Sequence, residues 1–436
     1  MIKRNRKWIA VLLIVGLVIS GVSVYADSSV HLMVDAEHVE TLLEIRDGRT
    51  MVPVSTLQDV FDATATWEDS RLILAFAEKT MMLEEGSASA WLDGEVVELD
   101  APWVMLNDIS WVPLAAIARS FGHAVFWNAQ HRTVEVMTRT NRLFSESVLA
   151  IASTGSLLLN GELGDLHEEI VASGEWDTPE NEAFRTVLKE IKEINDVTYV
   201  YTLIKSGTDE EPTLLIAESD YPEEFGDEYE MEPQFLKAFS GEPAYAPHFW
   251  DEDGVVMKSA FAPIYNSAGE VVAILGIDTE YDTMNHDANA LISAKVKAMA
   301  STGSLLLNGK MADLHEEILA SGEWDTPENE TFRVPLQQIR EINDATYVYT
   351  FVWESDEEVL LISEADYPEE FGTRYDMEPQ FLVAFSGTPA AAGHIWVDEE
   401  SMKSAFAPIY NTSGEIVALL GIDFEAPELA YVPELE

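Results

Sequence analysis

Two patterns of hydrophobic and polar residues alternate along the chain, and each predicts a different kind of element. Apolar residues at near-helical spacing, such as Leu291 and Met299, predict a helix in "TMNHDANALISAKVKAMASTGSLLLNG". A second helix is predicted after "DTPENE", where Asp177 or Thr178 caps the first turn and Pro179 suits the first helical position.

Strand patterns follow these helices. "TYVYTLI" and "TLLIAES" are rich in aromatic and β-branched residues, and "VMKSAFAPIY" and "VVAILGID" flank a turn at "NSAGE". A unit that is led by helices and closed by a two-stranded hairpin predicts an antiparallel sheet with helices packed on one side.

This helix-and-strand unit occurs twice. "GEWDTPENE" runs from Gly174 to Glu182 and again from Gly322 to Glu330, an offset of 148 residues. "DYPEEFG", "MEPQFL", "MKSAFAPIYN" and "LGID" recur in the same order, with small register changes at two places that look like loops. Identical stretches of this length indicate the tandem duplication of one domain.

A weaker internal repeat precedes the duplicated unit. "RTMVPVSTLQDVFDATATWEDSRLILAF" aligns with "SWVPLAAIARSFGHAVFWNAQHRTVEV", and each half predicts a short helix after a proline, a turn and two short strands. Between the halves, Asp93 and Gly94 predict a two-residue hairpin turn.

This N-terminal pattern resembles the N-terminal domain of copper amine oxidases. The resemblance rests on two "VP" dipeptides, each followed by a helix and then by Trp67 or Trp127. It implies a stalk or adhesion module. In that family the oxidase chemistry belongs to a separate domain, which needs an Asn-Tyr-acid sequence for its quinone and a His-x-His pair for copper. The sequence contains neither, so we expect no cofactor and no enzymatic activity.

Each duplicated unit resembles the extracellular sensor domains of the Cache type, which are relatives of the PAS fold. The shared features are the leading helix, the "YVYT" strand, the "SAFAPIYN" strand and the closing "LGID". The resemblance implies a pocket for a small molecule between one sheet face and its overlying loops. The predicted fold class is α+β and multi-domain: a small α/β stalk-type module, then two PAS/Cache-like domains, each an antiparallel sheet with a long N-terminal helix.

The closing strand carries the main candidate for chemistry. "VVAILGID" places Asp278 at the end of an apolar strand face, where a carboxylate is costly to bury unless it is paired. Lys258 on the neighbouring strand is the expected partner, either in a salt bridge or with both groups holding a ligand's amine and carboxylate. Tyr199 and Tyr201 share a strand face and suit either a pocket wall or core packing. With the second copy included, the expected ligand-binding residues are Tyr199, Tyr201, Lys258, Asp278, Tyr347, Tyr349, Lys403 and Asp423.

The net charge of the chain and its first residues indicate which partners and which cellular location to expect. The chain has 79 acidic and 25 basic residues, a formal charge of -54, and no cysteine. Such a surface repels nucleic acid and attracts cations. The N-terminus is basic, then apolar, and ends in "VYA", which is typical of an export signal, either cleaved or kept as an anchor. We therefore expect a secreted or cell-surface protein.

These patterns divide the chain into an export segment (1–26), the stalk-type module (27–138), two sensor-like domains (139–283 and 284–426) and a tail (427–436). Two functions remain open. The duplicated domains bind a small extracellular ligand, with a membrane signalling partner, or they are acidic spacers of a structural or adhesive cell-envelope protein that contacts the cell wall. No nucleophile elbow, phosphate loop or zinc spacing occurs in the sequence, so no metal site is expected.

Overall fold

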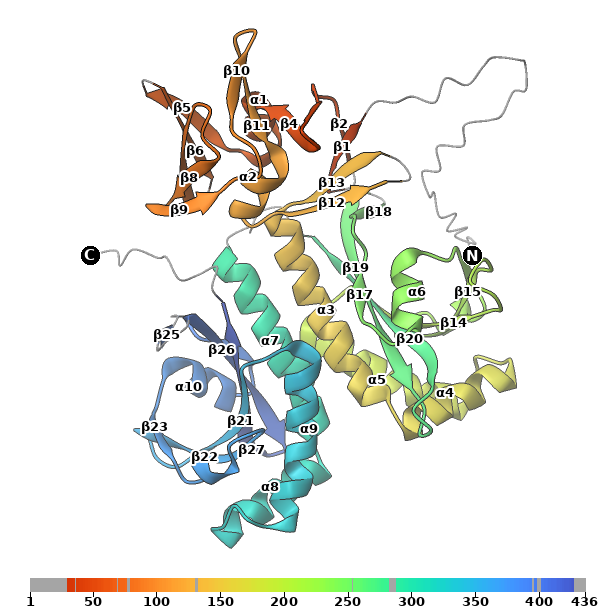
Figure 1. The fold of residues 1–436 in the computed structure, drawn as a ribbon. Coiled ribbons are helices and arrows are strands. Elements are labelled where there is room, and N and C mark those ends of the chain that lie inside the picture. The colour runs from red at the N-terminus through yellow and green to blue at the C-terminus, as the bar shows by residue number, and fades with distance from the viewer. Residues whose placement is uncertain are drawn as a thin grey trace.

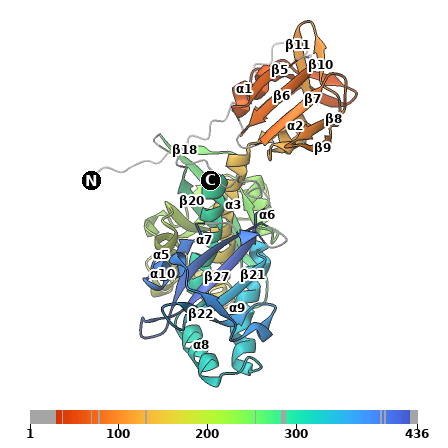
Figure 2. The ribbon, with the colours of Figure 1, turned by 90° about the vertical axis from the view of Figure 1, so that its left-hand side faces the viewer.

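The computed structural model describes residues 30–35, 37–68, 70–76, 79–129, 132–252, 254–281, 288–393, 396–397 and 401–426. The predicted export segment and the predicted tail lie outside these ranges. Within them, an N-terminal module stands above two similar domains built of helices and a sheet (Figure 1). The turned view shows the module displaced to one side of the two domains (Figure 2).

The N-terminal module consists of short strands and two short helices. One sheet has the order β12-β13-β1-β2, a second has β10-β11-β4-β3, and a third runs from β5 to β9 in sequence order. The helices are Val54–Phe61 (α1) and Leu114–Ser120 (α2). The strands are His31–Val34 (β1), Glu37–Val39 (β2), Glu44–Arg46 (β3), Arg49–Pro53 (β4), Thr64–Glu68 (β5), Arg71–Phe76 (β6), Lys79–Glu84 (β7), Ser89–Leu92 (β8), Glu95–Glu98 (β9), Val104–Leu106 (β10), Ile109–Pro113 (β11), Ala124–Asn128 (β12) and Thr133–Met137 (β13).

Local sequence explains the shape of this module. Helices α1 and α2 start directly after Pro53 and Pro113, and each is followed by two strands, as predicted. At the hairpin between β8 and β9, Asp93 and Gly94 have φ angles of 50° and 90°. Both angles lie in the left-handed region that a two-residue turn of this type requires.

The first copy is an antiparallel sheet with helices on both faces. Its strand order is β16-β15-β14-β20-β19-β17, and β18 also pairs with β19. The helices are Arg139–Leu159 (α3), Glu162–Ser173 (α4), Pro179–Asn195 (α5), Pro222–Glu224 (η1) and Pro233–Phe239 (α6). The strands are Tyr199–Lys205 (β14), Thr213–Glu218 (β15), Glu228–Tyr229 (β16), Ala244–Tyr245 (β17), Trp250–Glu252 (β18), Val255–Tyr265 (β19) and Val271–Glu280 (β20).

The second copy repeats this arrangement. Its strand order is β23-β22-β21-β27-β26-β24, and β25 also pairs with β26. The helices are Ala288–Leu307 (α7), Lys310–Ser321 (α8), Pro327–Asn343 (α9), Pro368–Glu370 (η2) and Pro379–Phe385 (α10). The strands are Tyr347–Trp353 (β21), Glu358–Glu364 (β22), Arg374–Asp376 (β23), Ala390–Ala391 (β24), Trp396–Val397 (β25), Ser401–Tyr410 (β26) and Ile416–Glu425 (β27).

Each sheet has two differently covered faces. In the first copy, Ala260 and Leu275 lie on the face that packs against α3 and α5, whereas Phe261 and Ile274 lie on the face covered by α6. This two-sided packing positions the candidate site, because neighbouring residues of one strand point to opposite faces. The predicted α+β class, with a long helix leading each antiparallel sheet, is confirmed. The prediction that the helices pack on one side of the sheet is wrong, because α6 covers the face opposite to α3 and α5.

The helix starts follow the predicted capping. The Thr178 hydroxyl accepts a hydrogen bond from the Asn181 backbone amide at 3.1 Å, and Pro179 is the first helical residue of α5. Helices α3 and α7 are long and apolar enough to span a bilayer, but most of each apolar stretch is buried within the fold. That burial is typical of core helices in globular domains.

Candidate functional site

The site in the first copy is centred on a buried carboxylate at the end of β20. Asp278 lies opposite Tyr199 on β14 and opposite Ser259 on β19, so these three side chains share one sheet face. The Tyr201 hydroxyl donates a hydrogen bond to Asp278 Oδ1 at 3.2 Å. Asp278 is only 4% exposed, so its charge is shielded from bulk water.

A glycine makes room for this tyrosine. Gly276 lies opposite Tyr201, and a Cβ atom added there would overlap the Tyr201 ring. Gly421 and Tyr349 repeat the arrangement in the second copy. The glycine of "LGID" therefore lets the ring lie flat on the sheet and brings its hydroxyl to the carboxylate.

Replacing Gly276 by alanine is expected to destabilise the first copy by about 2 kcal/mol, because the added methyl group displaces the Tyr201 ring from its packed position. Urea unfolding measures the loss. Gly393→Ala is the control for alanine in place of glycine, since no atom lies within 4 Å of a Cβ there and its backbone is not in the left-handed region. A Gly276→Ala protein as stable as the wild type would show that the ring is not held against the sheet.

The second copy has the same buried carboxylate, and both Tyr349 and Ser404 form side-chain hydrogen bonds to it. Asp423 is 5% exposed and accepts a hydrogen bond from the Tyr349 hydroxyl at 3.1 Å. Burial raises the pKa of Asp423 to about 6, against the opposing effect of hydrogen bonds from the Ser404 and Tyr349 side chains. Neutral hydroxyl groups thus surround a carboxylate that sits in a poorly solvated place.

The predicted pairing of Asp278 with Lys258 is wrong. Strand β20 bears a bulge at Val272, because Ile264 pairs with Ala273 and Tyr265 pairs with Val271. Beyond this bulge Lys258 lies opposite Thr279, while Ser259 lies opposite Asp278. The lysine therefore points to the opposite face of the sheet. Lys403 in the second copy is displaced in the same way, opposite Phe424, with Ser404 opposite Asp423. The three residues Tyr199, Lys258 and Asp278 cannot line one cavity.

Lys258 instead anchors the N-terminal module to the first copy. Its Nζ donates a hydrogen bond to Asn141 Oδ1 on α3 at 2.7 Å and lies 4.6 Å from the centre of the Phe249 ring. Asn141 in turn donates to Asp35 of the module at 2.8 Å. Burial lowers the pKa of Lys258 to about 7, although the charge of Asp35 opposes this effect. Lys403 bonds Asn289 at 2.8 Å in the second copy.

Tyr199 and Tyr347 lie at the rim of each site. Both are half-buried, and their rings face those of Tyr221 and Tyr367, with centroids 6.4 Å and 6.3 Å apart. Tyr221 and Tyr367 come from the "DYPEEFG" loop, so each rim joins the end of a strand to that loop.

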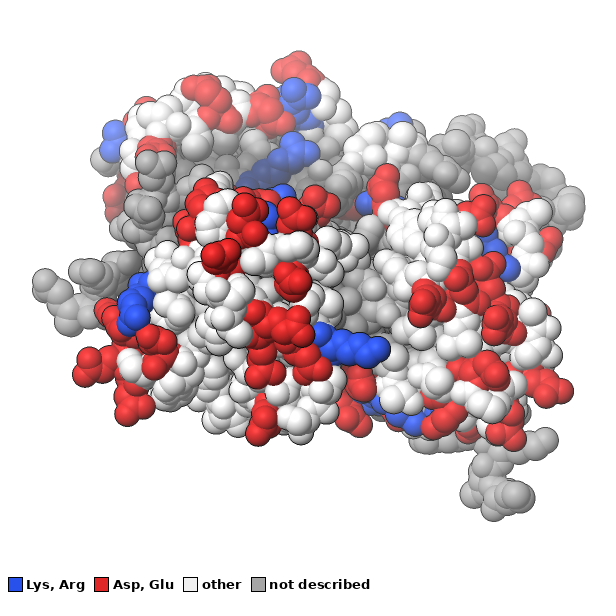
Figure 3. Space-filling model, turned by 90° about the horizontal axis from the view of Figure 1, so that it is seen from below, with Lys and Arg blue, Asp and Glu red and all other residues white. Residues whose placement is uncertain are grey.

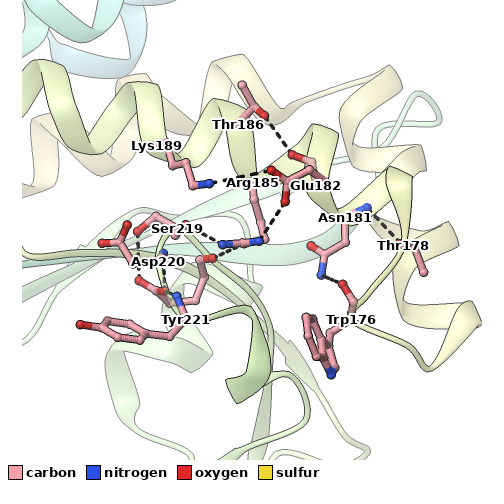
Figure 4. Close-up of polar contacts among 11 residues, drawn as sticks. Trp176, Thr178, Asn181, Glu182, Arg185, Thr186, Lys189, Ser219, Asp220 and Tyr221 are labelled. Carbon is pink, nitrogen blue, oxygen red and sulfur yellow. Dashed lines mark hydrogen bonds and ion pairs between the residues drawn. The ribbon is translucent and has the colours of Figure 1, made fainter.

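A polar network that sequence analysis missed holds this loop. Arg185 on α5 donates to the backbone carbonyls of Glu218 (2.6 Å) and Ser219 (2.8 Å) (Figure 4). The buried Glu218 carboxylate accepts hydrogen bonds from the backbone amides of Asp220 and Tyr221. Burial raises the pKa of Glu218, against the lowering effect of these hydrogen bonds. The charged groups thereby fix the loop that supplies one wall of the rim.

A buried asparagine on α5 and its counterpart on α9 differ in their hydrogen bonds, and this difference predicts a stability change. Asn329 Oδ1 accepts a hydrogen bond from the Ser363 hydroxyl at 2.7 Å, whereas the equivalent Asn181 Oδ1 is buried without a partner because Ala217 replaces that serine. Ala217→Ser is expected to stabilise the first copy by about 1 kcal/mol, measured by urea unfolding.

The reverse change, Ser363→Ala, is expected to destabilise the second copy by about 1 to 3 kcal/mol, because it leaves a buried acceptor unpaired.

For the Ala217→Ser prediction, the control is Ala217→Gly, which supplies no hydroxyl. A destabilised Ala217→Ser protein would contradict the expected bond.

The interior beside the Asp–Tyr pair is mostly filled. Leu203, Phe235, Phe261 and Ile274 pack together on the face that carries Tyr201. A cavity of about 520 Å³ lies at the adjoining end of the sheet, lined by Asp196, Val197, Thr198, Thr279 and Glu280. This cavity is lined by the sequence neighbours of Tyr199 and Asp278 but not by these two residues themselves.

Among the residues that the structure describes, no metal cluster accompanies the site. Over the described ranges, no three histidine, cysteine or acidic side chains are arranged to hold a metal ion. His167, in the "DLHEEI" segment, is fully buried, and its Nε2 bonds the Thr202 hydroxyl at 2.8 Å. His315 and Thr350 repeat this contact in the second copy at 2.8 Å. These histidines belong to the core on the other side of the sheet.

A family model described as the copper amine oxidase N-terminal domain matches residues 33–136. No curated protein matches the chain significantly. Among solved structures, the sensor domain of the V. cholerae histidine kinase DctB is 10% identical, with 66% of this chain and 95% of that chain covered and a TM-score of 0.24. The ligand-binding domain of the Pseudomonas aeruginosa amino acid chemoreceptor PctC, in complex with GABA, is 12% identical, with 66% and 99% covered and a TM-score of 0.19.

The ligand-binding domain of the Campylobacter jejuni chemoreceptor Tlp3, in complex with L-norvaline, is 11% identical, with 68% of this chain and 94% of that chain covered and a TM-score of 0.19. Residues 33–136 are thus similar to the copper amine oxidase N-terminal domain, as the two "VP" motifs predicted, and the chain is similar to sensor domains of histidine kinases and chemoreceptors.

Proposed function

We propose that the duplicated domains are non-catalytic, extracellular binding domains for a small molecule that carries a cationic amine. Asp278 and Asp423 accept the amine, and the rim tyrosines Tyr199 and Tyr347 contact the rest of the ligand. Lys258 and Lys403 are not proposed to bind a carboxylate of the ligand, because both lysines lie on the other sheet face.

The observation that carries the proposal is the buried carboxylate of Asp423. Burial of a charge among neutral hydroxyl groups is costly, and the pKa of about 6 expresses that cost. A cation delivered to the carboxylate would offset it. An amine supplies a positive charge together with hydrogen-bond donors. The Tyr349 and Ser404 hydroxyls supply donors but no positive charge.

The rim adds a second reason to favour an amine. Tyr221 is 37% exposed and Tyr367 is 47% exposed, so aromatic surface is available beside each carboxylate. Aromatic rings attract cations through their negative faces. A ligand amine approaching over the rim would therefore meet ring faces before it reaches the aspartate.

Thermal-shift titration of the whole protein with primary amines, amino acids and amine-free carboxylates tests the proposal. An amine-bearing compound at 100 times its Kd is expected to stabilise the protein by about 2.7 kcal/mol. The shift should shrink in Asp278→Asn and in Asp423→Asn and vanish in the double variant. The control is Asp196→Asn, an exposed acidic side chain close to the first site that is not part of it.

A shift that persists in the double variant, or no shift with any amine, would contradict the proposal. Extracellular display is tested by protease treatment of intact cells that express the full chain, since an exported protein is accessible to the protease. A separate membrane protein is the proposed receiver of the signal.

A spacer role in the cell envelope is the second candidate, and the packed interior favours it. Leu203, Phe235 and Phe261 occupy the sheet face on which a ligand pocket was expected. Acidic side chains greatly outnumber basic ones on the surface seen from below (Figure 3). A spacer would show no ligand-dependent shift, but its stability would rise with added divalent cations and would not depend on Asp278 or Asp423.

A further inference from the structure

The two copies meet through equivalent residues. Helices α3 and α7 lie side by side in both views (Figures 1 and 2). At their contact, Asn195 Nδ2 donates to Thr302 Oγ1 at 2.9 Å, and Asn343 Nδ2 donates to Thr154 Oγ1 at 2.9 Å. The two asparagines are separated by 148 residues in the sequence and so are the two threonines, so each bond is the counterpart of the other.

The hydrophobic cores are exchanged in the same reciprocal way. Ala150 of α3 belongs to the core of the second copy, and its counterpart Ala298 of α7 belongs to the core of the first. Leu157 packs against the second core and its counterpart Leu305 against the first. Reciprocal contacts between equivalent residues are the mark of a two-fold dimer interface. Here that interface lies within one chain.

The interface continues directly into the candidate sites. Asn195 ends α5, and a short turn leads from it to Tyr199, the residue opposite Asp278. On the other side of the contact, Thr154 precedes Gly155, where an added Cβ would lie 3.1 Å from Leu275 Cδ2 on β20. The Asn195–Thr302 bond therefore lies at the end of α5, directly before β14. The Asn343–Thr154 bond lies on α3, which packs tightly on β20, the strand that carries Asp278.

We propose that the two copies act as a fused homodimer in which the state of one Asp–Tyr pair alters the other through the reciprocal Asn–Thr contacts. This regulation rests on the proposed function, because it concerns the same two sites. The coupling itself exists without a ligand and is measurable in the free protein. Coupling of this kind is reciprocal by thermodynamic necessity, so a change in either copy must be felt in the other.

Hydrogen exchange of the full chain at pH 8, read by mass spectrometry, tests the coupling. Asp423→Asn perturbs the second copy, and the readout is exchange in β14 of the first copy, which contains no substituted residue. We expect exchange in β14 to change about fivefold in the same direction as in β21. In the Thr154→Val/Thr302→Val background, which removes both acceptors while keeping the branched shape, the effect is expected to stay within the second copy.

Ser156→Ala/Ser304→Ala is the matched control. These buried serines lie on the same helices and bond only the carbonyls of Ser153 and Ser301 in their own helix, so the response in β14 should persist. If the double valine variant does not fold, Thr154→Val and Thr302→Val made singly should each weaken the response.

Two outcomes would overturn the coupling: an unchanged β14 in Asp423→Asn, or a β14 response that survives the loss of both threonine hydroxyls. Amine binding does not enter this readout. Failure of the amine titrations would therefore remove the proposed ligand and leave the coupling standing. Failure of the hydrogen-exchange test would remove the coupling and leave the proposed amine binding standing.

Discussion

Acidification from pH 6.5 to pH 4 is expected to cost the duplicated domains about 3 kcal/mol of stability for each of two buried histidines. Burial lowers the pKa of His167 to about 4 and that of His315 to about 3. In the unfolded chain both side chains take up a proton near pH 6.5, whereas the folded chain binds none until the pH is much lower. The stability they support is therefore complete above pH 6.5 and is lost as the pH falls toward 4.

Urea unfolding at several pH values measures this loss. His167→Gln/His315→Gln, in which the amide can still bond Thr202 and Thr350, is expected to flatten the pH dependence by about 6 kcal/mol over the same interval. His38→Gln changes an exposed histidine of the N-terminal module and serves as control. An equally steep dependence in the double variant would assign acid sensitivity to other groups.

Asp423→Asn is expected to stabilise the second copy by about 3 kcal/mol at pH 8 and to have little effect near pH 3.5. The folded pKa of about 6 lies above the ordinary value of 3.8, so the folded state binds the proton more tightly than the unfolded chain does. The favourable contribution of the aspartate is complete below pH 3.8 and is lost as the pH rises through 6. Asparagine carries no charge and still offers an acceptor to the Tyr349 hydroxyl.

Unfolding of Asp423→Asn at both pH values, compared with Asp344→Asn, measures the effect. Asp344 is exposed at the end of α9 and should respond weakly. A destabilised Asp423→Asn protein at pH 8 would mean that the hydrogen bonds to the carboxylate already offset the cost of its burial. If the variant gains stability and loses amine binding, the aspartate is kept for function at the expense of stability.

Elements that depend on local residues were predictable from the sequence. The cap at Thr178, the prolines that start α1 and α2, and the Asp93–Gly94 turn each follow from backbone preferences of nearby residues. The buried aspartate was also predictable, because a charged residue ends an apolar alternation.

The partner of that aspartate was not predictable, because it depends on strand register. Continued from the Tyr265–Val271 pair at the turn, an unbroken hairpin would place Lys258 opposite Asp278. The bulge at Val272 of β20 moves the pairing by one residue and places Ser259 opposite Asp278 instead. Nothing in "VVAILGID" indicates that Val272 is an extra residue, and a shift of one residue exchanges the two faces.

The buried histidines were hidden for a different reason. "DLHEEI" reads as a solvated helix face because acidic residues surround His167, yet one side of α4 packs on the sheet and carries the histidine inward. The contact between the copies was invisible because its residues are small: alanine and threonine on a helix do not distinguish a core from an interface.

The α3–α7 contact has a consequence for how the two copies behave on dilution. A pair of separate subunits falls apart when it is diluted, since its association depends on concentration. Here a short peptide connection joins the halves, and their local concentration is set by that tether rather than by the surroundings. The pairing should survive release into an unlimited volume, and each half is free to accumulate substitutions that its twin does not share.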